Sequence, residues 1–284
     1  DKLKADALSL EHLLTHCPKN PYCETCQRSK MQSKAAPSLK KKKKAEEEDE
    51  LPKKFGAQIT ADHFIAHDDL DAALTGEKAA VVFRCRATNW LECYPTSGKS
   101  ADEAETAMID FQGSKDNIEE FYSDDSPELA KAARERGWVH RTATPGRPDT
   151  NGNAERAVRK VLEGIRCAIE QAGLPTTWWP WAARHYCFAH NISTKWSSND
   201  GKTPYEARHG AKFDGQLLPF GSIVEFKPSP TKGKILSKFA ARSVPGLFLG
   251  WHVAPGGKFR GDYIVIALSD VAKKEFAKHP RSFI

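Results

Sequence analysis

Residues 144–160, TPGRPDTNGNAERAVRK, join a turn rich in proline and glycine to the start of a long amphipathic helix. Apolar residues recur at helical spacing after Asn153, and Gly173 followed by Pro175 ends the pattern. A single carboxylate, Glu155, lies in the first helical turn. The sequence therefore predicts a helix that presents one acid near its amino end.

Three basic residues, Arg156, Arg159 and Lys160, follow that acid. Asn151 is a plausible N-cap of the helix, or Asn153 if the helix starts later. Cations along a helix surface suit a phosphate backbone, which they position without reading its sequence. A carboxylate beside them suits a metal ion. We therefore interpret this stretch as a metal and polynucleotide site, the alternative being a helix terminus with ordinary surface charge.

Strand-like and helix-like segments alternate around this helix. Runs of β-branched and aromatic residues predict strands at 56–66, 79–96, 117–125 and 138–145. Further helices are predicted at 100–113, 126–137 and 176–193, the last with Pro180 near its start. The pattern indicates an α/β fold, a mixed sheet with packed helices. After it, strands predicted at 221–228, 244–253 and 262–268 indicate a small β module.

The net charge of +6 is distributed unevenly along the 284 residues. Residues 1–54 hold 13 basic and 9 acidic side chains, residues 55–200 hold 16 and 22, and residues 201–284 hold 14 and 6. An acidic middle between basic ends fits a catalytic core that needs carboxylates, flanked by segments that bind a polyanion. Uneven surface charge without function is the alternative.

No apolar run approaches the ~20 residues that a membrane helix needs, and no signal peptide is visible. The chain begins at Asp1 and its two methionines lie inside it, so we expect a piece of a longer product. Seven cysteines, an odd number, favour a reducing compartment. Four of them are expected to be buried small residues: Cys85, Cys93, Cys167 and Cys187.

Residues 32–54 have almost no large apolar side chain and set five lysines, Lys40 to Lys44, against the acidic run EEEDE. Blocks of like charge repel one another and stay solvated. We predict a charged, flexible linker after a small amino-terminal module formed by residues 1–31.

That module carries His12, His16, Cys23 and Cys26 with the spacing H-x₃-H-x₆-C-x₂-C. Histidines four residues apart share a helix face, and the C-x₂-C pair supplies two thiolates. Together they are the four nitrogen and sulfur ligands of a closed tetrahedral zinc site. The short middle spacer leaves Cys17 as a possible substitute for one histidine, and chance cysteines near a helix are the alternative to a metal site.

Three acids occur where a sheet can bring them together. Asp62 lies on the first core strand, Asp124 ends a later strand, and Glu155 begins the long helix. Ligand sites in α/β sheets tend to lie at the carboxyl ends of strands. Each acid taken alone is more simply interpreted as a helix cap or a surface charge. His63 and His67 follow Asp62, but on a strand they face away from it or alternate with it, and they are assigned no metal role.

The motifs YSDDSPEL, at 122–129, and HRTATPGRPDTNGNAERAVR, at 140–159, resemble the integrase core of retroviruses and LTR retrotransposons. That family reads S/T-D-N-G-x-E-F, then a histidine and TPxxPQxNGxxER. Three motifs of the tail resemble the region after the core in copia-type elements: TPYEARHGAKF, LLPFGSIVEF and KILSKFAARSVPGLFLGW. The resemblance covers most of residues 55–268, with its motifs in order.

The resemblance assigns the three catalytic acid positions, in order, to Asp62, Asp124 and Glu155, which would hold Mg²⁺ or Mn²⁺. It also places the family's N-G motif at Asn151 and Gly152, and its E-R motif at Glu155 and Arg156. The DNA contacts expected from it and from the basic helix surface are Asn151, Arg156, Arg159 and Lys160.

The fold implied by the resemblance is an RNase H-like catalytic core over 55–200. A His-His-Cys-Cys zinc module, with Zn²⁺, would precede it, and residues 201–284 would form a basic β-rich DNA-binding region. The implied activity is two-metal polynucleotidyl transfer: 3′-end processing and strand transfer of element DNA. The expected partners are DNA and further copies of the chain, with no membrane or small-molecule substrate. The expected location is intracellular, in virus-like particles of the cytoplasm and in the nucleus.

Two departures from the family pattern bear on activity. Asp125 and Ser126 replace the usual Asn-Gly, and the 30 residues between Asp124 and Glu155 form a shorter gap than usual. Two alternatives therefore stand beside an active integrase. One is a decayed or co-opted copy that binds DNA without catalysis, and the other is a nuclease of the same fold that cuts without joining.

Overall fold

The computed structural model describes residues 2–31, 52–66, 72–142, 152–227, 239 and 241–272. Most of the predicted linker, His67 and Asn151 therefore lie outside the described residues. Within the described part, no helix is both long and apolar enough to cross a membrane. All seven cysteines are described and are free thiols.

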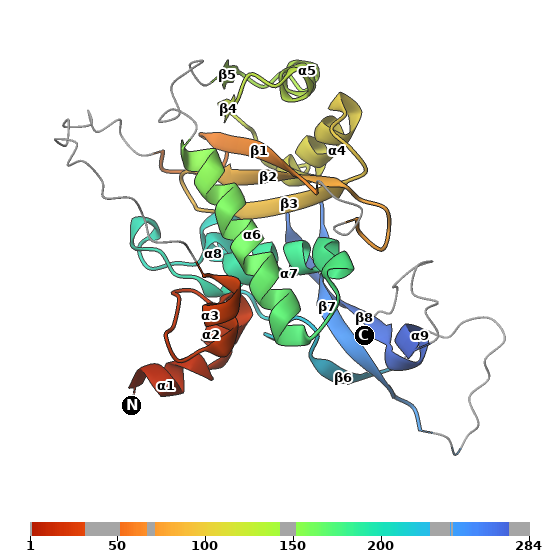
Figure 1. Cartoon of the computed structure of the whole chain (residues 1–284). Coiled ribbons are helices and arrows are strands. Elements are labelled where there is room, and N and C mark those ends of the chain that lie inside the picture. Colours follow the sequence, from red (N-terminus) through yellow and green to blue (C-terminus); the bar gives the residue numbers. More distant parts are fainter. Residues whose placement is uncertain are drawn as a thin grey trace.

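A five-stranded mixed sheet forms the centre of the fold, in the order β3-β2-β1-β4-β5 (Figure 1). The first three strands are antiparallel neighbours, whereas β4 and β5 run parallel to β1. This order and these directions are those of the RNase H-like fold, so the predicted fold class is confirmed. The strands are β1 (Ile59–Ile65), β2 (Ala79–Cys85), β3 (Leu91–Thr96), β4 (Phe121–Ser123) and β5 (His140–Thr142).

Helices cover both faces of this sheet. Alternate side chains of β2 enter two different hydrophobic clusters: Val81 and Phe83 join one, and Ala80 and Val82 join the other. The first cluster also takes apolar residues of α4 (Ala101–Gln112) and α5 (Pro127–Glu135). The second takes residues of α6 (Gly152–Ala172) and α7 (Trp179–Ser193), which follows a short 3₁₀ turn, η3 (Thr176–Trp178).

The predicted elements are present, with one refinement. The run 79–96 is a hairpin of two strands rather than one, because Asn89 adopts a left-handed conformation with φ 59° and turns the chain back. Pro95 is tolerated in β3 because β3 is an edge strand. Helix α4 begins at a capping box in which Ser100 and Glu103 each bond the other's backbone N–H.

Gly164, in the middle of α6, allows that helix to lie close against α7. A Cβ at this position would lie 2.3 Å from the ring of Tyr186. We expect Gly164→Ala to lower the free energy of unfolding by about 1–3 kcal/mol, since the clash outweighs the better helix propensity of alanine. Urea denaturation checks this. Gly152→Ala is the matched control, because a Cβ at Gly152 meets nothing within 4 Å; equal loss in both variants would contradict the packing.

The region after residue 200 adds a short helix and a second sheet. Helix α8 (Pro204–His209) follows the 3₁₀ turn η4 (Ser197–Asn199), and the strands are antiparallel in the order β6-β7-β8. The predicted small β module is thus present, with α9 at its end: β6 (Ile223–Phe226), β7 (Val244–Ala254), β8 (Lys258–Ala267) and α9 (Leu268–Ala272). Its Phe248 and Trp251 belong to the same hydrophobic cluster as Phe83 of the central sheet. The two sheets therefore share a core.

Arg208 of α8 ties this second part to the first. Its side chain is fully buried and lies over the rings of Phe55, at 3.7 Å, and Trp90, at 4.7 Å. It forms a 2.8 Å ion pair with Asp116 and lies 3.7 Å from Glu92. A buried cation held by two acids and two rings makes α8 an integral part of the fold.

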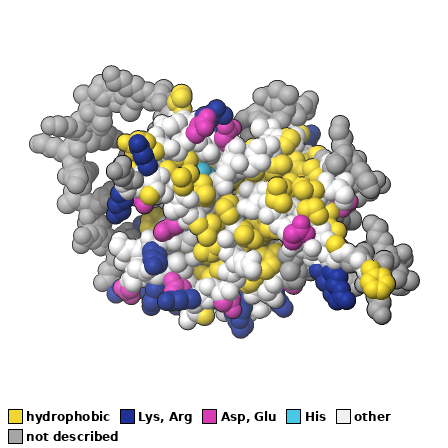
Figure 2. Space-filling view, turned by 90° about the horizontal axis from the view of Figure 1, so that it is seen from below, with side chains coloured by type: hydrophobic (Ala, Val, Ile, Leu, Met, Phe, Trp, Pro, Cys, Tyr) yellow, Lys and Arg dark blue, Asp and Glu magenta, His cyan; other side chains and the backbone are white. Residues whose placement is uncertain are grey.

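The amino-terminal residues form three short helices, α1 (Lys2–Ala7), α2 (Leu10–Thr15) and α3 (Glu24–Ser29). They lie beside the carboxyl half of α6 and against α7 (Figure 1). From below, hydrophobic side chains form a broad central area, with lysine and arginine side chains scattered around its edges (Figure 2). That face presents no single continuous basic patch among the described residues.

Candidate active site and metal centre

Asp62 lies in the middle of β1, opposite Val82 of β2, and so faces the side of the sheet that α6 covers. The backbone N–H of His63 donates a 2.7 Å hydrogen bond to its carboxylate. The pKa of Asp62 is raised to about 6, chiefly by burial and also by the negative charges of Asp124 and Glu155, while the His63 N–H and the charge of Lys99 lower it. The three predicted acids are thus close enough to interact.

Asp124 directly follows β4, which pairs in parallel with β1. Its Oδ1 atom is buried and has no hydrogen-bond partner. An unpaired buried carboxylate oxygen is costly unless a cation is bound to it. This orphaned oxygen, beside a second acid whose pKa it raises, fits a divalent cation.

Glu155 lies in the first turn of α6 and is exposed. The structure therefore brings the three acids to one side of the sheet from β1, the end of β4 and the start of α6. Their oxygens do not form a ready cluster, since the only group of three or more His, Cys, Asp or Glu side chains placed to hold a metal among the described residues is the His/Cys group. The residues just before α6 lie outside the described part.

Two cations near this site carried no signal in the sequence. Lys99, just before α4, lowers the pKa of Asp62 and lies 3.6 Å from Glu128. Arg84 of β2 is opposite Thr60 and shares the face of Asp62, and its charge interacts with that of Arg156. Neither residue lies in a motif, and only the sheet register places them here.

The predicted DNA-contact residues have different surroundings. Arg156 and Arg159 are exposed on α6, and Arg156 donates a 2.7 Å hydrogen bond to Asn153. Lys160 instead turns inward, with its ammonium 4.8 Å from the ring centre of Trp196, and burial lowers its pKa to about 8. The exposed cations of this helix start are therefore the two arginines.

The predicted zinc ligands converge. The ligand atoms of His12, His16, Cys23 and Cys26 all lie within 4.8 Å of one another, and all four residues are buried. Cys26 Sγ lies 3.4 Å from His12 Nε2, and His16 Nδ1 lies 3.5 Å from Cys23 Sγ. Ligand separations of about 3.4–3.8 Å are those of a tetrahedron with zinc bonds of 2.0–2.3 Å. The donor set and its spacing fit zinc.

The short middle spacer is accommodated by the backbone of His16. It ends α2 in the left-handed conformation, with φ 51°, and turns the chain toward the C-x₂-C pair. Cys17, the alternative ligand, lies outside the group, with its sulfur 3.9 Å from the Tyr186 hydroxyl. Burial lowers the pKa of His12, and lowers that of His16 to about 4, so both imidazoles are neutral and available as ligands at neutral pH.

The raised pKa of Asp62 gives a prediction about stability. The pKa of Asp62 in the folded chain, about 6, exceeds the ordinary value of 3.8, so the folded chain holds a proton more tightly, and this stabilisation is lost as the pH rises from about 4 through 6. We expect Asp62→Asn to raise the free energy of unfolding at pH 7, without metal, by about 1–2 kcal/mol after allowance for solvent screening.

Urea denaturation in EDTA at pH 7 and pH 4.5 measures this difference, which should shrink at the lower pH. Asp125→Asn is the control, since Asp125 is exposed and should show no such dependence. Lower stability of Asp62→Asn at pH 7 would mean that the carboxylate is paired, contrary to this account.

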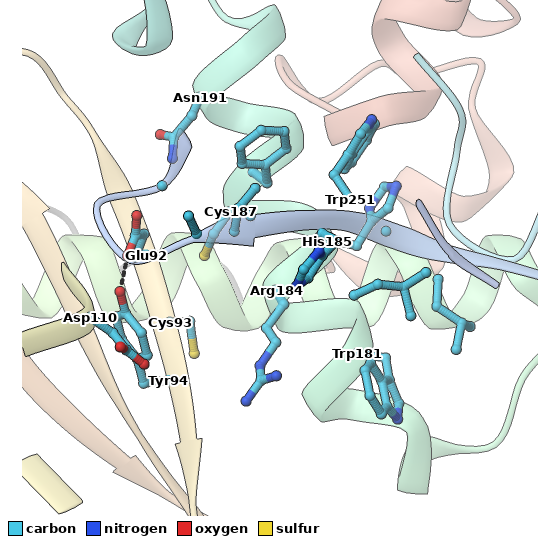
Figure 3. A pocket seen from close by; sticks show the side chains of 18 of the residues that line it. Glu92, Cys93, Tyr94, Asp110, Trp181, Arg184, His185, Cys187, Asn191 and Trp251 are labelled. Atoms are coloured by element: carbon cyan, nitrogen blue, oxygen red, sulfur yellow. Dashed lines mark hydrogen bonds between the residues drawn. The ribbon is translucent and has the colours of Figure 1, made fainter. Parts of the chain in front are cut away.

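A cavity of about 230 Å³ lies elsewhere, between α7, the edge strand β3 and β7. Trp181, Arg184 and Cys187 line it from α7, and Glu92 and Tyr94 line it from β3 (Figure 3). The Tyr94 hydroxyl donates a hydrogen bond to Glu92 inside it. None of the predicted site residues lines this cavity.

The strand order and directions define an RNase H-like fold, and beside it four converging His and Cys side chains form a group that could hold a metal ion. No family model matches the chain. Over 110 residues, 36% of this chain, it is 31% identical to the retrovirus-related Pol polyprotein from transposon RE1 of Arabidopsis thaliana. Over 68 residues, 24% of this chain, it is 34% identical to that from transposon TNT 1-94 of Nicotiana tabacum.

These aligned stretches cover 7% and 5% of the two polyproteins, so the chain spans a small part of their length. The resemblance to retrotransposon polyproteins that the motifs predict is confirmed by these two relatives.

Solved structures similar to the chain include the catalytic core domain of BIV integrase, with 18% identity, a TM-score of 0.39, and coverage of 53% of this chain and 92% of that one. The HTLV-2 integrase catalytic core domain in complex with magnesium is 14% identical, with a TM-score of 0.42 and coverage of 55% of this chain and 98% of that one. A chain of a simian T-cell lymphotropic virus intasome in complex with PP2A regulatory subunit B56 gamma is 13% identical, with a TM-score of 0.44 and coverage of 75% of this chain and 76% of that one. The order and directions of the five strands, rather than these similarities, define the RNase H-like fold of this chain.

Proposed function

We propose that the chain is the integrase part of an LTR-retrotransposon polyprotein and that it catalyses 3′-end processing and strand transfer of element DNA. One observation carries the proposal: three acids from β1, the end of β4 and the start of α6 interact on one side of an RNase H-like sheet. The sequence similarity to retrotransposon Pol polyproteins supports the same assignment.

Asp62, Asp124 and Glu155 are the residues that would hold Mg²⁺ or Mn²⁺. The orphaned Oδ1 of Asp124 and the raised pKa of Asp62 are the features of this chain that favour such binding. When bound, a pair of divalent ions stabilises the attacking and leaving oxygens of an in-line phosphoryl transfer.

The reaction proceeds in two steps. Water first hydrolyses a phosphodiester near the 3′ end of the element and frees a 3′-hydroxyl. That hydroxyl then attacks a target phosphodiester, so a new P–O bond forms while the bond to the target's 3′-oxygen breaks. The exposed guanidinium groups of Arg156 and Arg159 hold backbone phosphates beside the acids, which positions the DNA without reading its sequence.

The same proposal includes the remaining partners. His12, His16, Cys23 and Cys26 would hold Zn²⁺. One active site acts on each element end, so at least two copies act together. The proposed location is a virus-like particle in the cytoplasm, followed by the nucleus.

A strand-transfer assay tests the proposal. Labelled, pre-cut element-end DNA and plasmid target are incubated with Mg²⁺ or Mn²⁺ and either the native chain or Glu155→Gln. Joined products that disappear in the variant are expected. Nicking without joining would favour a nuclease of the same fold, and DNA binding without chemistry in both proteins would favour a decayed copy.

A further inference from the structure

His16 uses its two ring nitrogens toward two different parts of the molecule. Its Nδ1 faces the sulfurs, 3.5 Å from Cys23 Sγ and 3.7 Å from Cys26 Sγ. Its Nε2 lies 2.5 Å from Oε1 of Gln171, which is 155 residues away on α6. The ring therefore bridges the candidate zinc site and the long helix of the catalytic core.

Two more contacts surround this bridge on the same part of α6. Arg28 of α3 forms a 2.9 Å ion pair with Glu170. The hydroxyl of Ser29 donates a 3.3 Å hydrogen bond to the backbone carbonyl of Arg166. The amino-terminal module is thus seated on residues 166–171 by polar contacts, of which the one through His16 also reaches the metal ligands.

The chemistry of an imidazole ligand explains why this bridge matters. A histidine that ligates through Nδ1 carries its proton on Nε2, and a hydrogen-bond acceptor at that N–H fixes the tautomer and the ring orientation. The amide oxygen of Gln171 is such an acceptor. It comes from the catalytic core rather than from the module itself.

We propose that Gln171 is the positioning residue of the zinc site, and that zinc binding and docking of the amino-terminal module on α6 are coupled through the His16–Gln171 hydrogen bond. The proposal rests on the zinc assignment made above. Because coupling between two equilibria is reciprocal, losing the hydrogen bond weakens zinc binding, and losing zinc weakens docking. Helix α6 also carries Glu155 at its other end, so the docked module braces the helix that presents a catalytic acid.

The test measures zinc affinity in the full chain by competition with a chromophoric chelator. Gln171→Ala is expected to bind zinc about tenfold more weakly or worse, as for other outer-shell partners. Gln171→Glu keeps an acceptor oxygen and should bind at least as tightly as the native chain. Arg166→Ala is the matched control on the same helix, because Ser29 bonds only its backbone carbonyl and its side chain bonds Leu162 within the helix.

Hydrogen exchange at the carboxyl half of α6 gives a second readout. Exchange should speed up when zinc is removed from the native chain, and it should be fast in Gln171→Ala already at zinc concentrations that saturate the native chain. Native affinity in Gln171→Ala would overturn the coupling while leaving the zinc site standing. A native chain that binds no zinc would overturn both.

Discussion

Asp124→Asn is expected to lower the rate of strand transfer by more than about 100-fold. Losing a side chain that binds the metal directly should lower activity at least as much as losing a residue that only hydrogen-bonds to a ligand. The carboxylate of Asp124 has a buried, unpaired oxygen and raises the pKa of Asp62, so its charge is the feature that would attract a divalent ion. An amide has nearly the same shape but no charge. The measurement is the rate of joining at saturating Mn²⁺.

Asp125→Asn is the control for this experiment. Asp125 is the next residue, is exposed, and occupies the position where the family has asparagine. It should keep near-native joining, and neither variant should lose stability. Loss of joining in Asp125→Asn with activity retained in Asp124→Asn would show that the ligand is the neighbouring carboxylate and that the assignment is wrong.

Arg208→Met should lower the free energy of unfolding by about 3–5 kcal/mol, the usual cost of removing one partner of a buried ion pair. Methionine can fill much of the space between Phe55 and Trp90, but it leaves Asp116 without its partner. It also leaves the carbonyls of Phe111 and Gln112 without a donor. Urea denaturation of the full chain measures the change.

An exposed arginine of the same region provides the control, because its loss removes a positive charge without breaking a buried ion pair. Arg260 of β8 is exposed, and Arg260→Met should change the free energy of unfolding by less than about 0.5 kcal/mol. A loss below 1 kcal/mol for Arg208→Met would mean that α8 is not anchored to the core in this way.

Local patterns in the sequence predict the elements well. The helical spacing after Asn153 and the Gly173–Pro175 stop correspond to α6, which ends at Ala172. The four ligands of the amino-terminal module converge as the H-x₃-H and C-x₂-C spacings predict, although the spacer is short. These features could be predicted because the residues that determine each of them are close together in the chain.

Long-range contacts could not be predicted in the same way. The buried position of the Lys160 ammonium depends on its contact with the Trp196 ring, and the docking of the amino-terminal module on α6 includes the His16–Gln171 hydrogen bond. Arg208 meets Asp116 only after two sheets have packed together. A residue's charge and spacing do not reveal such partners, because the tertiary fold, and not the local sequence pattern, brings the two partners together.

The measurement that tests the central claim most directly is the anomalous scattering of Mn²⁺ in crystals of the chain bound to element-end DNA. The account predicts Mn²⁺ peaks between Asp62, Asp124 and Glu155, with their carboxylate oxygens drawn in to bond distance. Well-ordered DNA ends at this edge of the sheet, with no Mn²⁺ among the three acids, would contradict it.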